Sequence, residues 1–472
     1  MEALIQPTNL LDRFNKWIQE SIMIKLLSIG FLILILLIPS NWIQDMIVER
    51  QQRAGEVMQE VATKWSGRQA ITGPVLVIPF RKEEMIDRGK DGKEIREVVD
   101  KAFFLPEQLD ITGKINPEIL NRGIFDAVVY ESAVQIKSSF GKPDFKSLGI
   151  SDEMILWNGA HIVCGITDLR GISDNPVFTV ADKAFTAEPS NHIGVSVRTK
   201  PTENNPYSSE ARMETSSSSG IVTKLNWENA DSFTGNVSIK LNLKGSQRLD
   251  FVPVGKTTDV KLDGPWADPS FDGEFLPTTR EITKQNFSAS WKVLHFNRPF
   301  SQEWTGSGQE LAGADFGVRL LLPVDQYQKS MRTSKYGVLI ILLTFISLFL
   351  VEIIQKVRIH PFQYILIGAA LIIYYTLLLS FSEHVGYNVA YIVSSIATVI
   401  LVSLYSTSFL PSKKLSVLLL LLLVIFYAFV FIIILQQDFS LLIGSLGLFL
   451  IISLLMYFSR KINWYRNTLS QV

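Results

Sequence analysis

The sequence predicts a membrane protein with six transmembrane helices, arranged as one plus five, and a large β-rich, sandwich-like domain after the first helix. Three observations support this fold class. Apolar, almost uncharged sequence is confined to residues 22–40 and to the region from residue 336 onward. Between them lie short runs in which apolar and polar residues alternate, as in half-buried strands. The short loops between apolar stretches carry Lys and Arg on one side only.

A transmembrane helix needs about 20 mostly apolar residues, because the hydrocarbon core is about 30 Å thick. Six stretches are long enough: residues 22–43, 336–354, 362–381, 390–410, 415–435 and 439–458. The first could be a cleaved signal peptide, but bulky residues (IPSNWIQDMI) follow it instead of a small-residue cleavage site. We therefore interpret it as an uncleaved signal anchor.

The loop charges predict the orientation of the helices. Lys and Arg lie around the start of the first stretch, between the second and third, between the fourth and fifth, and after the sixth: Arg13, Lys16, Lys25, Lys356, Arg358, Lys413, Lys414, Arg460, Lys461 and Arg466. The loops SEHVGYN and QQD contain neither residue type. Both termini are therefore expected in the cytoplasm. Lys329, Arg332 and Lys335 would lie outside, but long domains translocate largely regardless of charge.

The expected organisation follows from these assignments: a cytoplasmic N-terminus at residues 1–21, a transmembrane helix at 22–43, an external β-rich domain at 44–335, a five-helix bundle at 336–458 and a cytoplasmic tail at 459–472. Residues 46–65 show apolar residues at helical spacing, so we expect them to continue the first helix and dock on the domain. The serine-rich segment 203–220 is expected to be a flexible loop. Either it divides two β-subdomains, or the region is one large β-domain.

Period-2 alternation predicts three half-buried strands, at residues 128–140, 236–243 and 287–293. A shorter apolar run at 74–80 predicts a fully buried strand. The expected buried faces consist of Val128, Tyr130, Val134, Ile136 and Phe140, then Val237, Ile239, Leu241 and Leu243, then Phe287, Ala289, Trp291 and Val293. With turn residues between the runs, we expect an antiparallel β-rich domain.

The composition excludes several function classes. The chain has 45 basic and 45 acidic residues, and this balance argues against a nucleic-acid-binding surface. Its single cysteine, Cys164, cannot form an intramolecular disulfide and lies in an apolar run, so a buried, inert thiol is expected. No HExxH, CxxC, GxSxG or P-loop motif is present, so we expect no metal site, no cofactor and no catalytic residue.

Ser382, Glu383 and His384 form the first candidate site. A carboxylate beside an imidazole could relay protons or bind an ion at the membrane surface. The simpler interpretation is a turn between the third and fourth helices on the outer side, whose polar groups are hydrated or contact the underside of the external domain.

Glu352 is the second candidate, because it is the only acid within the second transmembrane helix. Lys356, Arg358 and Lys414 are its expected partners. Since Glu352 is close to the end of its helix, it can reach interfacial water and need not mark a transport route. The rest of the bundle interior is expected to be apolar. The aromatic residues near the helix ends are expected in an interfacial belt: Trp42, Tyr336, Tyr364, Tyr391, Tyr457 and Trp464.

Several long blocks resemble a known family. They are ERQQRAGEVMQEVATKWSGRQAITGPVLVIPF (49–80), FFLPEQLDITGKINPEILNRGIFDAVVYES (103–132), GITDLRGI (165–172), GSQRLDFVPVGKTTDVKLDGPWADPSFDGEFLPTTREI (245–282), FGVRLLLPVDQYQKSMRTSKYGVLII (316–341) and RIHPFQYILIGAALIIYYTLLLSFSEHVGYNVAY (358–391). Their order and spelling resemble the CreD family of bacterial inner-membrane proteins linked to cell-envelope integrity. The resemblance implies a periplasmic β-domain and production in envelope stress under two-component control. It implies no established catalytic chemistry.

Two functional hypotheses result. The first is a non-enzymatic inner-membrane protein that supports envelope integrity through its periplasmic domain. Its partners would be the lipid bilayer and an unknown envelope protein or cell-wall component, and not nucleic acid. The alternative is a transporter or a membrane-embedded enzyme acting on lipid or cell-wall precursors, supported by Glu352, Glu383 and His384.

Overall fold

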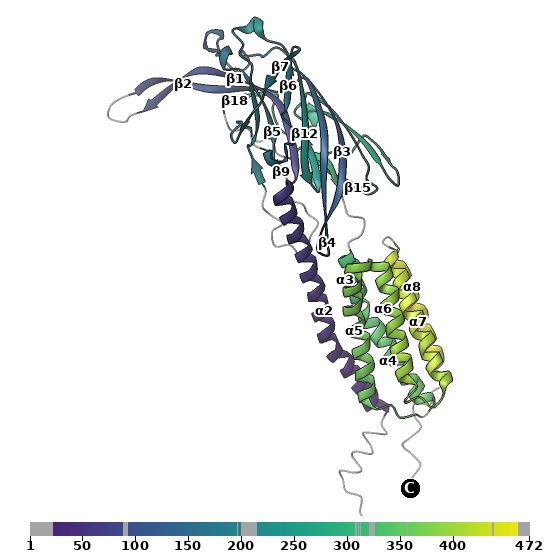
Figure 1. Cartoon of the computed structure of the whole chain (residues 1–472). Helices are drawn as coiled ribbons and strands as arrows, with labels where there is room; N and C mark the ends of the chain where they lie inside the picture. The colour runs from purple at the N-terminus through teal and green to yellow at the C-terminus, as the bar shows by residue number, and fades with distance from the viewer. Residues whose placement is uncertain are drawn as a thin grey trace, which may run out of the picture. The chain divides into compact units, whose positions relative to one another are not determined.

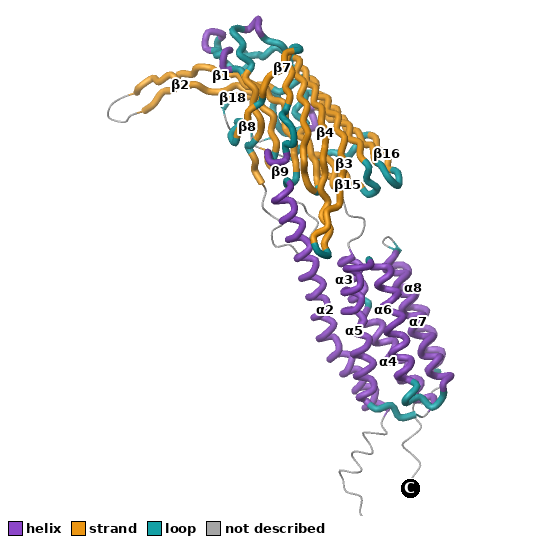
Figure 2. The backbone as a smooth tube through the Cα atoms, in the orientation of Figure 1, coloured by secondary structure: helices purple, strands orange, loops and turns teal. Residues whose placement is uncertain are grey.

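The computed structural model describes residues 22–87, 93–195, 197–199, 215–306, 309, 311, 313–320, 326–355, 357–436 and 439–460. The chain divides into two compact units (Figure 1). We call Met1–Gln51 with Val324–Val472 the membrane unit, and Gln52–Pro323 the β unit. Helices make up the first and mostly strands the second (Figure 2). The expected N-terminal segment 1–21, most of the expected loop 203–220 and nearly all of the expected tail 459–472 lie outside the described residues.

The helices are α2 (Ile22–Trp65), α3 (Gln326–Lys335), α4 (Gly337–Gln355), α5 (Pro361–Val385), α6 (Tyr387–Ser406), α7 (Lys413–Leu435) and α8 (Ser440–Ser459). Within the described residues, five helical segments are long and apolar enough to cross a membrane: α2, α3 with α4, α5, α6 and α7. The sixth expected span coincides with α8, whose described apolar stretch, Leu442–Ser453, is shorter than the others. Five candidate membrane spans are thus present by length and composition, and the sixth stays a prediction.

The ends of α5 correct one expectation. Pro361 occupies its first position, where no backbone hydrogen bond is lost, and the preceding His360 caps the helix: the Phe362 N–H donates to its Nδ1 at 3.2 Å. At the other end α5 continues to Val385, and only Gly386, at φ 76°, separates it from α6. The expected hydrated turn at Ser382–His384 is therefore wrong, because these residues form the last turn of α5.

The expectation that residues 46–65 continue the first helix is confirmed, because α2 is one helix of 44 residues. Its C-terminal part packs within the β unit, where Val61 joins a small apolar cluster with Ala127 and Val129. Glu60 and Arg122 form an ion pair at 2.6 Å beside this cluster.

The β unit contains two mixed sheets and a short strand pair. The first sheet has nine strands, in the order β15 (Pro269–Gly273), β19 (Phe316–Leu320), β13 (Arg248–Val252), β1 (Gln69–Asp87), β5 (His161–Ile166), β11 (Gly220–Lys224) and β8 (Glu188–Ser190), with β2 (Lys93–Phe104) on β1 and β18 (Glu303–Thr305) on β2. The second has eight: β16 (Thr279–Ile282), β17 (Phe287–Leu294), β14 (Thr257–Gly264), β3 (Gln108–Arg122), β4 (Phe125–Ser139), β12 (Asn236–Ser246), β6 (Val177–Val180) and β7 (Lys183–Thr186). The strands β9 (Val197–Thr199) and β10 (Thr215–Ser217) pair with each other.

The expected antiparallel arrangement is wrong at two places. β1 runs parallel to β13, and β3 runs parallel to β14. Parallel neighbours need long crossover connections, and here more than a hundred residues separate the partners, so local alternation carries no information about their direction. The other strand pairs are antiparallel.

One hydrophobic core lies between the two sheets. The expected buried faces of β4, β12 and β17 are confirmed, since every residue assigned to them is buried. The rings of Trp291, on β17, and Phe316, on β19, pack 5.6 Å apart and join the two sheets. Cys164 is also fully buried, and burial raises the pKa of its thiol to about 12, as expected for an inert cysteine.

Candidate functional site

Of the candidates Ser382, Glu383 and His384, only Glu383 forms a hydrogen bond or ion pair with another helix among the residues that the structure describes. Ser382 is buried, and its hydroxyl donates to the Leu379 carbonyl of the same helix at 2.8 Å. His384 is exposed. Consecutive residues of a helix project about 100° apart. The carboxylate and the imidazole therefore do not form the proton-relay pair that their adjacency in sequence suggested.

Glu383 joins three helices of the membrane unit. Its side chain is only 7% exposed, although it stands in the last turn of α5. Arg50 Nε of α2 lies 3.8 Å from its carboxylate. The Tyr327 hydroxyl of α3 donates to the same oxygen at 3.3 Å. We call Glu383, Arg50 and Tyr327 the α5-end cluster.

The short helix α3 packs across the bundle end at which α5 and α6 meet (Figure 2). It contacts α4, α5, α6 and α7. Five of its residues are buried: Tyr327, Ser330, Met331, Thr333 and Ser334. The hydroxyls of Thr333 and Tyr387, at the start of α6, lie 2.6 Å apart, so α3 is bonded to both α5 and α6.

Glu352 is the centre of a second cluster. Its side chain is 4% exposed, and Lys25 Nζ of α2 lies 2.7 Å from it. The Tyr364 hydroxyl donates to the other carboxylate oxygen, Oε2, at 3.1 Å. The Ile359 N–H donates at 3.4 Å to Oε1, the oxygen that Lys25 contacts. We call Glu352, Lys25 and Tyr364 the α4-end cluster.

Two expectations about Glu352 are therefore wrong. It does not reach interfacial water, because its carboxylate is buried. Its ion-pair partner is Lys25, while Arg358 and Lys414, two of the expected partners, are exposed. Lys356, the third expected partner, lies outside the described residues.

The two clusters share one arrangement: a buried carboxylate on a bundle helix, a cation on α2 and a tyrosine hydroxyl. A buried carboxylate without a partner is costly in a membrane protein, and the α2 cation offsets this cost. Lys25 and Arg50 are 25 positions apart, about 38 Å along a helix, compared with a hydrocarbon core of about 30 Å. The clusters are thus spaced to stand near opposite membrane surfaces.

The expectation of an otherwise apolar bundle interior is also wrong. Five tyrosines of α5, α6 and α7 are buried together: Tyr374, Tyr375, Tyr387, Tyr391 and Tyr427. The Tyr374 ring lies 4.7 Å from that of Tyr427 and 5.9 Å from that of Tyr391. The Tyr391 hydroxyl donates to the Tyr427 carbonyl at 2.8 Å.

Ser394, Ser395 and Thr398 of α6 are buried as well, and the Ser395 hydroxyl lies 3.5 Å from the Tyr374 hydroxyl. The hydroxyls of Tyr427 and Ser394 have no hydrogen-bond partner within the described part of the chain. Tyr364 and Tyr391, expected in an interfacial belt, are buried instead. The sequence did carry a signal, since Tyr387, Tyr391, Ser394 and Thr398 follow the helical i, i+4, i+7, i+11 spacing on one face of α6.

The comparison with known proteins agrees with the membrane helices. The chain matches the family described as "Inner membrane protein CreD" over residues 21–465. The chain belongs to the CreD family. It is also 29% identical over 455 residues to "Inner membrane protein CreD" of Escherichia coli (strain K12), and the alignment covers 95% of each chain. The resemblance stated from the sequence blocks is confirmed, and this CreD-family chain is a membrane protein.

The β unit of this CreD-family chain contains a buried charge cluster that the sequence did not reveal. Arg68, just before β1, lies 2.7 Å from Asp250 and 3.1 Å from Asp315. Arg248, on β13, lies 2.5 Å from Asp250 and 3.7 Å from Asp315. Burial raises the pKa of Asp315, and the neighbouring Asp250 carboxylate raises it further. Two arginines and two aspartates thus compensate each other where β1, β13 and β19 begin.

No group of three or more His, Cys, Asp or Glu side chains in the described residues could hold a metal ion. His161 is within 2.8 Å of the Gly159 carbonyl through Nδ1, which gives it a structural partner. The CreD family is named as an inner membrane protein and not as an enzyme.

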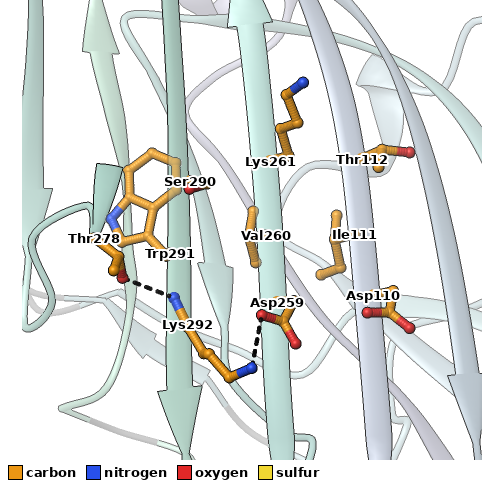
Figure 3. Close-up of a pocket in the computed structure, with 10 residues that line it drawn as sticks. All are labelled: Asp110, Ile111, Thr112, Asp259, Val260, Lys261, Thr278, Ser290, Trp291 and Lys292. Atoms are coloured by element: carbon orange, nitrogen blue, oxygen red, sulfur yellow. Dashed lines mark hydrogen bonds and ion pairs between the residues drawn. The ribbon is translucent and has the colours of Figure 1, made fainter. Parts of the chain in front are cut away.

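The second sheet presents a polar face with a shallow hollow of about 310 Å³ (Figure 3). Three consecutive residues of each of β3, β14 and β17 line it together with Thr278, and the charged ones are Asp110, Asp259, Lys261 and Lys292. Lys292 Nζ lies 3.8 Å from Asp259, and the Lys292 N–H donates to the Thr278 hydroxyl (Figure 3). We call the outward residues of these strands, with those of β4 and β12, the polar sheet face.

Proposed function

We propose that this chain is a non-enzymatic, multi-pass protein of the bacterial inner membrane that supports envelope integrity through a periplasmic β unit. The observation that carries the proposal is the distribution of Lys and Arg at the helix ends. Lys25 begins α2, Arg358 links α4 to α5, Lys413 and Lys414 begin α7, and Arg460 follows α8. Gly386 alone links α5 to α6.

Cytoplasmic loops carry an excess of Lys and Arg, so these positions belong on the inner side. Both termini are then cytoplasmic, and the β unit faces the periplasm. This arrangement needs α8 as a sixth span, for which its 20 residues are long enough. Membership in the CreD family supports the inner membrane as the location.

The β unit suits a binding or bracing role. It has one extensive core, and its polar sheet face offers a broad, charged surface to an envelope protein or a cell-wall component. Surfaces of mixed charge favour recognition of a specific partner by electrostatic complementarity.

Topology can be tested with alkaline-phosphatase fusions, which are active only outside the cytoplasm. A fusion after Gly386 is expected to be active, and fusions after Lys414 and Arg460 inactive. Activity after Lys414 would exclude the proposed orientation.

The role can be tested by complementation of a deletion strain under detergent and cell-wall-antibiotic stress. The full chain is expected to restore tolerance. Reversing three charges on the polar sheet face, Lys240→Glu, Lys261→Glu and Lys292→Glu, is expected to abolish it at normal protein levels. A matched triple variant of exposed lysines elsewhere in the β unit, Lys142→Glu, Lys146→Glu and Lys224→Glu, is expected to retain it. If strains that carry the two variants tolerate the stress equally well, the protein does not act through the polar sheet face.

A transporter or membrane-embedded enzyme acting on lipid or cell-wall precursors is the second candidate, favoured by the buried tyrosine cluster. Tyr374→Phe and Tyr427→Phe remove two hydroxyls and keep the rings. If this double variant abolishes tolerance at normal protein levels, the bundle has a chemical role. Unchanged tolerance would favour the first proposal.

A further inference from the structure

We propose that α3 is a binding surface for the headgroup of an anionic phospholipid at the membrane surface. The inference requires that α4 to α7 cross a membrane. It does not depend on which end of the bundle faces the periplasm.

The position of α3 follows from helix lengths. α4 has 19 residues, about 29 Å of helix, which matches the hydrocarbon core of about 30 Å. α3 directly precedes α4, with only Tyr336 between them, and lies across the ends of α4 to α7. It therefore lies beyond the hydrocarbon core, at the level of the lipid headgroups.

All the charged residues of α3 are basic. Lys329, Arg332 and Lys335 are three positions apart, so they succeed one another along the helix surface. Gln326–Lys335 contains no acidic residue. The ion pairs of the membrane unit use Lys25 and Arg50, and no described Asp or Glu forms an ion pair with the three α3 cations.

The opposite side of α3 holds the cations in place. Tyr327, Ser330, Met331, Thr333 and Ser334 are buried against the bundle. The Tyr327–Glu383 and Thr333–Tyr387 hydrogen bonds fix the two ends of the helix. Lys329 Nζ lies 5.8 Å from the centre of the Tyr387 ring, so this cation is placed at the start of α6.

The surface beside the cations suits acyl chains. The first turns of α6, at the same end of the bundle, expose the apolar side chains of Val389, Ile392 and Val393, next to one polar residue, Asn388. On a helix these three project away from Tyr387, on the outer surface of the bundle, where the acyl chains of a bound phospholipid would lie. A free phosphate ion would use only the cations, so an apolar outer surface at this end favours a lipid.

The test uses the purified full chain in detergent, titrated with phosphatidylglycerol or with zwitterionic phosphatidylcholine, with bound lipid counted by native mass spectrometry. Each basic residue near an anionic headgroup contributes about a fivefold gain in affinity. The triple variant Lys329→Gln, Arg332→Gln and Lys335→Gln is therefore expected to bind phosphatidylglycerol roughly a hundredfold more weakly. Phosphatidylcholine is expected to bind weakly to both proteins.

Two controls keep the result interpretable. Lys329→Arg with Lys335→Arg preserves the charge and is expected to bind like the unaltered chain. Lys240→Gln, Lys261→Gln and Lys292→Gln remove the same charge from the β unit and are expected to leave lipid binding unchanged. The inference is overturned if the α3 triple variant, folded by circular dichroism, retains phosphatidylglycerol, if phosphatidylcholine binds equally well, or if millimolar inorganic phosphate displaces the lipid.

Discussion

Among the described residues of the membrane unit, the buried carboxylates of Glu352 and Glu383 each pair with a cation of α2. In the Lys25–Glu352 pair, the two side chains differ in their access to water. Lys25 is 32% exposed, whereas Glu352 is 4% exposed. Lys25→Ala leaves the buried Glu352 carboxylate without its ion-pair partner. Glu352→Ala leaves Lys25 unpaired, but its ammonium group can reach water. We expect Lys25→Ala to lower the free energy of unfolding by about 2 kcal/mol more than Glu352→Ala. Thermal unfolding of both variants in detergent measures this asymmetry.

The double variant Lys25→Ala with Glu352→Leu provides the control for this prediction. It removes both charges, so we expect it to be more stable than Lys25→Ala alone. A double variant that is less stable than Lys25→Ala would show that packing, and not charge compensation, determines the stability here.

Asp168 of the β unit stabilises the C-terminal end of α2 through hydrogen bonds. The Asp168 carboxylate accepts hydrogen bonds from Gly67 N–H at 3.0 Å and from the Arg170 side chain, and Arg170 in turn donates to the Thr63 carbonyl of α2 at 2.8 Å. Burial acts to raise the pKa of Asp168, but these hydrogen bonds from Arg170 and Gly67 outweigh it and lower the pKa to about 2.

A carboxyl group whose pKa is lower in the folded state stabilises the fold above its unfolded pKa, and this contribution is lost as pH falls toward the folded pKa. We therefore expect the β unit to lose stability between about pH 4 and pH 2. Asp168→Asn should destabilise the unit at pH 7 by about 1 kcal/mol and reduce the acid-induced loss. Tryptophan fluorescence during urea unfolding at several pH values measures both effects. If Asp168→Asn loses as much stability between pH 4 and pH 2 as the unaltered chain, other carboxylates cause the loss.

Elements defined by local spacing could be predicted from the sequence, and their partners could not. The alternation of Val237, Ile239 and Leu241 with polar residues is a local pattern, so the sequence alone predicted the buried face of β12 correctly. The expected end of α5 at residue 381 was too early. Polar residues such as Ser382 and Glu383 do not by themselves end a helix. The residue that marks the end is Gly386, at positive φ. Lys25 and Glu352 are 327 positions apart, and no local pattern pairs them.

The whole molecule divides into two units with separate cores, and α2 is one helix shared by them. In the β unit the core centres on residues such as Trp291 and Phe316, and in the membrane unit on residues such as Leu371 and Tyr374. Domains with their own cores unfold as separate cooperative units, so two thermal transitions are expected for the full chain in detergent.

Core substitutions should assign these transitions to the two units. Trp291→Ala opens a cavity in the β unit and should cost about 3–5 kcal/mol, which lowers its transition temperature by roughly 10 °C. Leu371→Ala should shift only the transition of the membrane unit, because each cavity is confined to one core. Calorimetry of the three proteins measures the shifts. If either substitution lowers both transition temperatures equally, the two units unfold together. Such a result would contradict independent unfolding and indicate that α2 couples the two units.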